Sequence, residues 1–457
     1  MPNGAPILVR GAPPGSRVKI QYAGKKKRIH RGRRLGLVRP PARGTKPQCV
    51  AFGVCGGCVL QELQLQAQRE HKESYGIAAV KQGLGHSLDS VLVRPIVGSE
   101  LAYGYRNKVE ISFGVRRYLC EADMKRGLPI EGRFLGFHAP ERFDRVVDVE
   151  RCHLVGDGPN SLLTTVRKHV LGGESPLWDN RAHQGFWRYL LLRVGQATQE
   201  LLVGLFTTTA DVEQTGEVER LVEELQSTPL PDGARLAGVV WKEFDGVADV
   251  AKGVTRHVWG EDRLTEELHS SGPLVFGLST ASFFQTSTTG AQILYGTIEG
   301  ALGDCNGTLY DLYCGVGSIG LFLAHRFERI IGIEEVEQAI VDARANAARN
   351  GIDKADYRVG RVEQLLHGLD LIEEGRAIVV DPPRAGLHPK VARHLARCQG
   401  DVLVYVACNP SSLGRDGAVF ESGGWRLTEL STVDLFPQTG HLEMVGRFIK
   451  GPGPSDL

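Results

Sequence analysis

The sequence has no long apolar run and few cysteines, and these two absences exclude several classes of protein. Among its 457 residues no apolar stretch is long enough to cross a bilayer, and the N-terminus carries no hydrophobic signal segment. Nine cysteines in so long a chain do not make the dense disulfide framework of a small secreted domain. We therefore expect a soluble, cytoplasmic protein with reduced thiols, no membrane partner, and two or three domains.

Acidic residues are absent from the first 61 positions, which hold thirteen Lys and Arg. This segment carries a formal charge of +13 and the remainder carries −12. A basic arm on an acidic body favours a polyanionic partner such as nucleic acid, and a solvated basic tail has the same composition. Short alternating segments separated by glycine predict a small β-barrel or hairpin over residues 1–46.

Gly315, Gly317 and Gly320 form a G-x-G-x-x-G string between a short apolar strand and a helix. Such glycines let the backbone turn tightly and let a ligand approach it closely. Alone, the string suits NAD, FAD or S-adenosylmethionine. Further strands and a helix follow at 329–334, 337–350, 377–381 and 401–407. Their alternation predicts an α/β, Rossmann-like fold with a parallel sheet and ligands at the carboxyl ends of its strands.

Chemically distinctive residues follow directly on these strands: Tyr313, Glu334, Asp381 and Cys408. Glu334 is placed to accept hydrogen bonds from ribose hydroxyls. Cys408, on a turn before Asn-Pro at the ligand edge, is a candidate nucleophile, although most lone cysteines are buried structural ones. Glu443 leads into the last strand and is a candidate proton acceptor. Together these groups fit thiolate addition to C6 of a pyrimidine, followed by methylation at C5.

A second cluster of chemistry lies in Cys49-Val-Ala-Phe-Gly-Val-Cys55-Gly-Gly-Cys58. Three cysteines separated by glycines can wrap a metal centre, and four thiolates suit either zinc or an iron–sulfur cluster. The fourth ligand must come from elsewhere, and we favour Cys152 over Cys120. From 96 to 270 the pattern is strand-like and irregular, which predicts an antiparallel β-rich domain joined to this loop.

These motifs in combination resemble those of the RNA uracil-C5-methyltransferases, most closely the iron–sulfur branch with an N-terminal TRAM module. The resemblance spans nearly the whole chain. It is carried by the four cysteines, Gln285, Asp311-Leu-Tyr-Cys-Gly-Val-Gly, Asp381-Pro-Pro-Arg-Ala-Gly, Val406-Ala-Cys-Asn-Pro and Phe436-Pro-Gln-Thr-x-His-x-Glu.

The resemblance implies a role for each matching residue and a set of partners. Cys408 is implied as the nucleophile and Glu443 as the base that removes the C5 proton. S-adenosyl-L-methionine is expected among Gln285, Tyr313, Ser318, Glu334 and Asp381, and a [4Fe–4S] cluster on Cys49, Cys55, Cys58 and Cys152. Arg106, in Tyr105-Arg-Asn-Lys108, is expected to hold the target nucleotide. The implied substrate is 23S ribosomal RNA, or else the T-loop uridine of tRNA, for a monomer with no obligatory protein partner.

The implied domains are a TRAM-like segment at 1–46, a β-rich domain at 47–270, and a catalytic domain at 271–457, with the helical part at 61–93 able to pack on the catalytic domain. Two departures from the family pattern stand out. The chain begins about fourteen residues before Gly15, so the resemblance implies a truncated barrel. Arg361 occupies the position of a family acid that meets the adenine amine, and Glu363 is a candidate substitute.

Three other functions fit parts of the sequence. A nicotinamide oxidoreductase accounts for the glycines and Glu334, but gives no reason for Cys408 or Glu443. A cytosine-C5 DNA methyltransferase shares the thiolate chemistry but places its cysteine in the loop that here runs from Asp381 to Leu387, which has none. A non-catalytic RNA-binding protein accounts for the basic arm but leaves Cys408 without a role.

Overall fold

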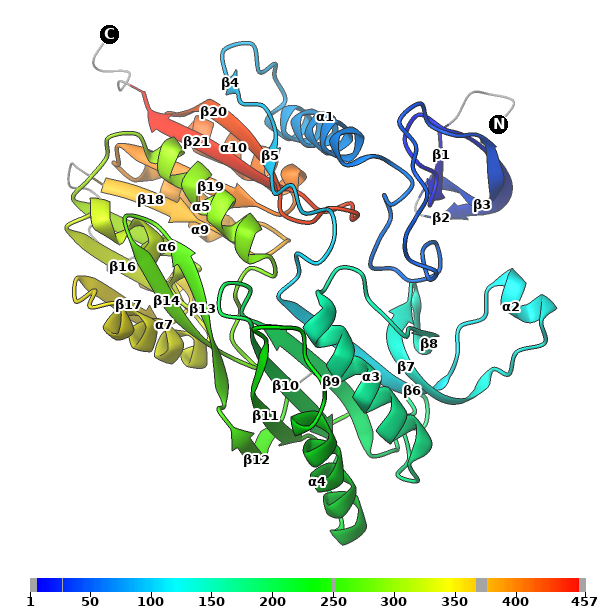
Figure 1. Ribbon diagram of the computed structural model, residues 1–457. Helices are drawn as coiled ribbons and strands as arrows, with labels where there is room; N and C mark the ends of the chain where they lie inside the picture. The colour runs from blue at the N-terminus through cyan, green and yellow to red at the C-terminus, as the bar shows by residue number, and fades with distance from the viewer. Residues whose placement is uncertain (1–5, 27, 249–251, 367–375, 452–457) are drawn as a thin grey trace.

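The N-terminal part of the molecule is a small β-sheet. In Figure 1 it stands apart from the larger sheets of the central and C-terminal parts. The computed structural model describes residues 6–26, 28–248, 252–366 and 376–451. The strands β1 (Ile7–Arg10), β2 (Arg17–Lys26) and β3 (Ile29–Arg39) are arranged in the order β1-β3-β2. These residues form an open three-stranded sheet, so the predicted small barrel is not confirmed.

The central part is a seven-stranded sheet in the order β12-β11-β10-β9-β6-β7-β8. Its strands are β6 (Lys108–Arg116), β7 (Glu131–Ala139), β8 (Arg142–Asp148), β9 (Trp187–Val194), β10 (Glu200–Thr207), β11 (Arg235–Glu243) and β12 (Val254–Gly260). The helices α3 (Asp157–Gly172) and α4 (Val212–Gln226) share one apolar core with it, and the short α2 (Glu121–Lys125) lies outside that core.

The prediction of a purely antiparallel central domain is wrong at one pair of strands. β10 and β11 are parallel, while the other pairs of this sheet are antiparallel. The helix α4 lies between them in sequence, and a parallel pair needs such a crossover. Apolar residues alternate in the same way in parallel and antiparallel strands, so the sequence pattern did not reveal the direction of this pair.

The C-terminal part is a larger sheet, in the order β17-β16-β15-β18-β19-β21-β20-β4, with β5 also on β20. Its strands are β4 (Leu92–Val93), β5 (Val97–Gly98), β15 (Thr308–Leu312), β16 (Arg329–Glu334), β17 (Ala355–Val359), β18 (Arg376–Val380), β19 (Val402–Ala407), β20 (Trp425–Asp434) and β21 (Glu443–Lys450). The run from β17 to β19 is parallel, and β21 is antiparallel to β19. The predicted Rossmann-like α/β fold is confirmed.

Helices cover this sheet, and a hairpin adjoins it. The helices are α5 (Thr288–Leu302), α6 (Ser318–Leu323), η1 (Ala324–Arg326), α7 (Glu337–Arg349), α8 (Val362–Leu365), α9 (Pro389–Arg397) and α10 (Pro410–Ser422), and the hairpin is β13 (Arg263–His269) with β14 (Pro273–Ser279).

The helix α1 (Leu65–Leu84) belongs spatially with this C-terminal sheet (Figure 1). It crosses α10 at two glycines, where a Cβ on Gly83 would lie 2.7 Å from the backbone of Gly414. The strands β4 and β5 then join the edge of the sheet beside β20. Residues 65–98 therefore form part of the layer that carries the candidate active site. None of the helices in the described ranges is both long and apolar enough to cross a membrane.

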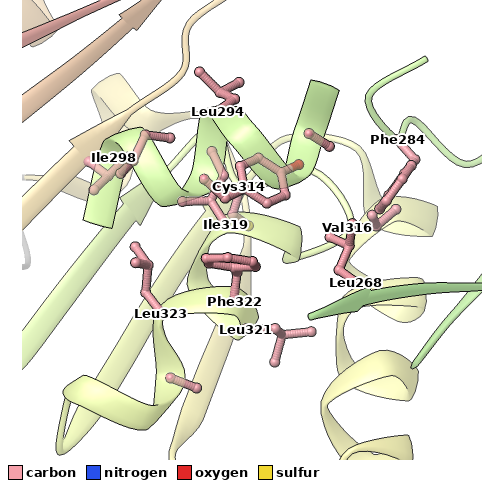
Figure 2. Packing of buried hydrophobic residues seen from close by; sticks show 14 of the residues in the cluster. Leu268, Phe284, Leu294, Ile298, Cys314, Val316, Ile319, Leu321, Phe322 and Leu323 are labelled. Carbon is pink, nitrogen blue, oxygen red and sulfur yellow. The ribbon is translucent and has the colours of Figure 1, made fainter. Parts of the chain in front are cut away.

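The glycine string is seated on a continuous apolar core (Figure 2). Cys314, Val316 and Ile319 point into this core with Leu294 and Phe322, and all are at least 95% buried. Their burial anchors the loop, in which Tyr313 and Gly315 are half-buried whereas Gly317 and Gly320 are buried. The loop is thus a firm platform for a ligand.

The close crossing of α1 and α10 can be tested with a pair of glycine variants. We predict that Gly414→Ala destabilises the protein by about 1–3 kcal/mol, because its Cβ would lie 2.6 Å from the carbonyl oxygen of Val80. Gly296→Ala, in open space on α5, should stabilise by about 0.5–1 kcal/mol. Urea unfolding of both variants checks this, and equal stabilities would contradict it.

Candidate active site and cysteine cavity

The glycine loop is tied to the end of β16 by the acid predicted to bind ribose. Glu334 accepts hydrogen bonds from the N–H of Gly315 (3.3 Å, at Oε2) and of Val336 (2.9 Å, at Oε1). Gly317 has φ +78°, and a Cβ there would lie 2.4 Å from the Tyr357 hydroxyl. Only glycine fits this turn without displacing its neighbour.

Tyr313 stands beside the glycine loop in a strained backbone conformation. Its φ is +65°, a region that aromatic residues rarely adopt and that is held only where the surroundings enforce it. It lines a cavity of about 1000 Å³ together with Glu335, Arg361 and Glu363. Burial and, next, the charge of Glu363 raise the pKa of Tyr313. The surrounding structure therefore keeps the Tyr313 ring in the lining of this cavity in spite of the backbone strain.

Arg361, the departure noted in the sequence, pairs with Glu335 (Nε to Oε2, 3.5 Å) at the start of α8, and both side chains are exposed. Glu363 is the charge that acts most strongly on the Tyr313 hydroxyl. Glu363 therefore provides an acid near Tyr313, although Arg361 occupies the position at which the family pattern has one.

Ser318, within the glycine string, and Gln285, just before α5, are engaged differently. The buried Ser318 hydroxyl pairs with the Tyr295 hydroxyl at 2.7 Å, so it faces the α5 side. Gln285 is half-buried, and its carbonyl oxygen accepts a hydrogen bond from Asn107 Nδ2 (2.9 Å). The Ser318 side chain is thus already used within the protein, whereas Gln285 is held by its backbone.

Carboxyl groups gather behind the glycine loop, and the pKa of each is raised. Asp311 is fully buried, and burial and the charge of Asp381 raise its pKa to about 7. Burial also raises the pKa of Asp381 to about 7. Glu443 is buried too, and burial with the charge of Asp381 raises its pKa well above the usual range. Asp381 is the common neighbour, so the three carboxyl groups form one acidic cluster.

Cys408 faces Glu443 across two neighbouring strands. In the β19–β21 ladder Ala407 pairs with Met444, and the next step brings Cys408 opposite Glu443. Burial raises the pKa of the half-buried Cys408 thiol to about 11, with further increases from Glu443 and Asp381 and a decrease from Arg384. The two residues predicted as nucleophile and base thus lie together at the carboxyl edge of the sheet.

The cysteines predicted to bind a metal line one cavity of about 370 Å³: Cys49, Cys55, Cys58 and Cys152. Burial raises the pKa of Cys55 to about 11 and that of Cys58 to about 12, and each thiol also senses Cys49 and Cys152. Asn160 holds Cys152 by both backbone groups (2.9 and 3.0 Å). Cys120 is not among the residues that line this cavity. Within the described ranges, no three His, Cys, Asp or Glu side chains form a group that could hold a single metal ion.

Arg106 lies between the cysteine cavity and the active site. It lines the cavity, and its guanidinium carbon is 5.9 Å from the centroid of the Phe436 ring. Its Nε is buried and has no hydrogen-bond partner among the described residues. The residues on either side of Arg106 bind two other segments. The Tyr105 hydroxyl donates to the Pro437 carbonyl (2.8 Å), and Asn107 Nδ2 donates to the Gln285 carbonyl.

Comparisons with known proteins agree with this geometry. Residues 248–450 match the model of the tRNA (uracil-5-)-methyltransferase family. The chain is 34% identical over 457 residues to an uncharacterized RNA methyltransferase of Chlorobaculum tepidum, covering 98% of this chain and 92% of that protein. A similar protein of Caldanaerobacter subterraneus is 33% identical over 447 residues, with 97% and 94% covered.

A solved structure extends the likeness to the whole fold. It is the Pyrococcus abyssi tRNA (uracil-54, C5)-methyltransferase in complex with S-adenosyl-L-homocysteine, with a TM-score of 0.72 and 25% identity over 97% of this chain and 95% of that chain. The chain belongs to the RNA uracil-C5-methyltransferase family. The resemblance inferred from the motifs is thereby confirmed, and the enzyme is an RNA methyltransferase.

Sequence reasoning missed several residues of this methyltransferase that contact the loops next to Glu443 and Asp381. Gln68 and Lys72 of α1 contact the loop before Glu443, and Asp416 of α10 accepts the Leu387 N–H (2.8 Å) in the loop after Asp381. No local signal in the sequence marks Gln68 and Lys72, because the stretch around them is polar on all sides.

The charge environment of Cys408 leads to a prediction about its reactivity. The thiolate is the reactive form, so alkylation of Cys408 should be slow at neutral pH and increase toward about pH 11. Glu443→Gln removes a negative charge that raises the thiol pKa, so the profile should move to lower pH, whereas Glu429→Gln on β20 should leave it unchanged. Peptide mapping after iodoacetamide pulses checks this. Equal profiles in the two variants would contradict the proximity of Glu443.

Proposed function

We propose that this enzyme transfers a methyl group from S-adenosyl-L-methionine to C5 of a uridine in RNA, through a transient bond between Cys408 Sγ and C6 of the base. The observation that carries the proposal is the placement of Cys408 opposite Glu443, beside the acidic cluster at the edge of the sheet where ligands are expected. An oxidoreductase or a purely RNA-binding protein would need neither residue there.

The acidic cluster would suit a cationic cofactor. Burial raises the pKa of all three carboxyl groups, and the charge of Asp381 raises the pKa of Asp311 and Glu443 further. Ionising the three groups together is therefore costly. A sulfonium or ammonium group placed among them would supply the missing countercharge. The Pyrococcus abyssi relative was solved in complex with S-adenosyl-L-homocysteine, which supports a cofactor of this kind. Tyr313, Glu334, Gln285 and the backbone at Ser318 would hold the nucleoside and amino-acid parts, and Glu363 would stand near the adenine in place of Arg361.

The cofactor supplies an electrophilic methyl group, and the protein does the remainder with two side chains. The Cys408 thiol would give its proton to solvent, and the nearby Arg384 guanidinium favours the thiolate. The thiolate would add to C6, and the electron pair of the ring double bond would move to C5. C5 would then take the methyl group as the bond from that methyl to the sulfonium sulfur breaks, which releases S-adenosyl-L-homocysteine. The Glu443 carboxylate removes the C5 proton, the double bond re-forms, and Cys408 leaves C6. A buried carboxylate with a raised pKa is a stronger base than one in water, which suits it to this last step.

The RNA to be methylated is best chosen from the surroundings of the site. The basic N-terminal sheet (Ile7 to Arg39) is suited to a folded RNA, and the Arg106 guanidinium lies beside the Phe436 ring, where it would contact the nucleotide. We favour a uridine of 23S ribosomal RNA, which the family resemblance implies. A transfer RNA uridine is the second candidate, because the relative of known structure acts on uracil 54 of tRNA.

We further propose that the cysteine cavity holds a [4Fe–4S] cluster. In such a cluster each thiolate binds a different iron, so the sulfurs stand farther apart than around one zinc ion. The four cysteines share one cavity, which is the arrangement that a cluster held by four thiolates needs. Deprotonation of the buried thiols would accompany binding, and Asn160 would fix the backbone at Cys152.

We predict opposite outcomes for the two reacting residues. Cys408→Ala should abolish methylation while leaving RNA affinity largely intact, because the nucleophile is lost and the RNA-binding surface is not. Glu443→Gln should accumulate a denaturant-resistant protein–RNA adduct, because addition and methyl transfer proceed but the C5 proton stays. Methyl incorporation and denaturing gels check both. Full turnover by Cys408→Ala would refute the mechanism.

The cluster is tested by its metal content. Protein purified without oxygen should be brown and contain about four irons per chain. Cys152→Ala should lose this iron, whereas Cys120→Ala, outside the cavity, should keep it. A colourless protein with stoichiometric zinc would overturn the assignment.

Comparison of 5-methyluridine in RNA from cells with and without this enzyme distinguishes the two substrates. The proposal expects one modified position to disappear from 23S ribosomal RNA. Loss confined to transfer RNA would select the second candidate, and an unchanged pattern in both would contradict the proposed function.

A further inference from the structure

One face of α1 lies along the segment that leads into Glu443. Gln68, Lys72 and Gly76 are spaced four residues apart and so share one side of the helix. A Cβ on Gly76 would lie 2.6 Å from Met444 Sδ and 2.9 Å from Leu442 Cδ1, so the helix backbone touches the start of β21. This face therefore lies against residues on both sides of the candidate base.

Gln68 makes a reciprocal pair of hydrogen bonds with Gln438. Its Oε1 accepts the backbone N–H of Gln438 at 2.8 Å, and its Nε2 donates to the Gln438 side-chain oxygen at 2.9 Å. Gln438 has φ +70°, an unfavourable conformation for a residue with a side chain. The contact with Gln68 helps to hold this strained turn of the loop at 436–441.

Lys72 makes a buried ion pair at the other end of the same loop. Its Nζ lies 2.6 Å from Asp434 Oδ1 and donates to the Phe436 carbonyl at 2.9 Å. Lys72 is 2% exposed and Asp434 is fully buried. A buried ion pair adds little stability relative to apolar groups of the same size, so stability alone is a weak reason for having one here.

The geometry of the Lys72–Asp434 pair indicates instead a role in placing Glu443. Asp434 follows Val433 on β20, and Val433 is the partner of Glu443 in the β20–β21 ladder. The Phe436 carbonyl that Lys72 binds also accepts from the backbone and hydroxyl of Thr439 (3.2 and 2.8 Å). Lys72 thus fixes both the strand end beside Glu443 and the turn that precedes it.

Other segments from the first part of the chain add to this support. The N–H groups of Val59 and Leu60, directly after Cys58, donate to the Gln438 carbonyl at 2.8 and 3.0 Å. The Tyr105 hydroxyl donates to Pro437. The loop is therefore held chiefly by residues more than three hundred positions away in sequence.

We propose that Gln68 and Lys72 are positioning residues, which hold the loop at 436–441 so that Glu443 reaches the C5 proton. The inference rests on the proposed function, because it assumes that Glu443 performs the last step. Misplacement of the loop should slow proton removal more than the earlier addition by Cys408, which stands on a different strand. A shift of about 1 Å in a catalytic group can cost about a hundredfold in rate.

The test compares Gln68→Ala with Gln66→Ala, an exposed glutamine on the same helix. A second variant, Lys72→Met with Asp434→Asn, replaces the ion pair by uncharged groups and avoids leaving a buried charge unpaired. For each full-length enzyme, steady-state methylation of substrate RNA, the fraction of enzyme in denaturant-resistant adduct, and the melting temperature are measured. Glu443→Gln is the reference for a blocked last step.

We expect Gln68→Ala and the double variant to turn over about 10- to 100-fold more slowly and to accumulate adduct, while Gln66→Ala behaves as the parent enzyme. Turnover within twofold of Gln66→Ala would overturn the inference. Slow turnover without adduct would overturn it as well, because it would indicate a general loss of folded structure. If Glu443→Gln itself forms no adduct, the role of Glu443 in the proposed function fails first.

Discussion

The antiparallel pairing of β21 with β19 is the constraint on which the active site depends. A sheet of parallel strands alone would place Cys408 at the end of β19 with no strand running back toward it. Because β21 is inserted in the opposite direction, its first residue lies at the same edge as the last residue of β19. The site thus combines a nucleophile and a base that are 35 positions apart in sequence. Everything that fixes the start of β21, including α1, bears on their geometry.

The second constraint is electrostatic. Asp311 and Glu443 are buried, Asp381 is half-buried, and the pKa of each carboxyl group is raised. Such an arrangement costs stability, since the acids are desolvated and repel one another when ionised. The cost would fall if a cation lay among the three carboxyl groups. The proposed sulfonium cofactor would therefore contribute its charge as well as its methyl group.

The sequence predicted the elements whose signal is local. The glycines at 315, 317 and 320, and the acid that ends β16, marked the turn between β15 and α6 as the candidate cofactor loop, and the structure shows this turn tied to Glu334. The family motifs identified the four cysteines that share a cavity, although their spacing alone allowed Cys120 as well as Cys152. The parallel β10–β11 pair was missed because strand direction leaves no trace in the alternation of side chains.

Residues whose role depends on distant contacts were beyond sequence reasoning. Gln68 and Lys72 looked like ordinary polar positions of a surface helix, yet both are buried against a loop near the other end of the chain. The Arg361 substitution was visible in the sequence, but only the structure showed it paired with Glu335 while Glu363 faces Tyr313. In both cases the deciding fact is which partner is near in space.

The central claim is that Cys408 bonds to the uracil ring, and substrate RNA carrying 5-fluorouridine tests it most directly. Fluorine at C5 leaves no proton for Glu443 to remove, so the addition product cannot break down. Digestion and mass spectrometry should then find a methylated fluorouridine nucleotide on the peptide that contains Cys408. Free, unmodified Cys408 under conditions in which ordinary uridine RNA is methylated, or a nucleotide bound to a different residue, would contradict the account.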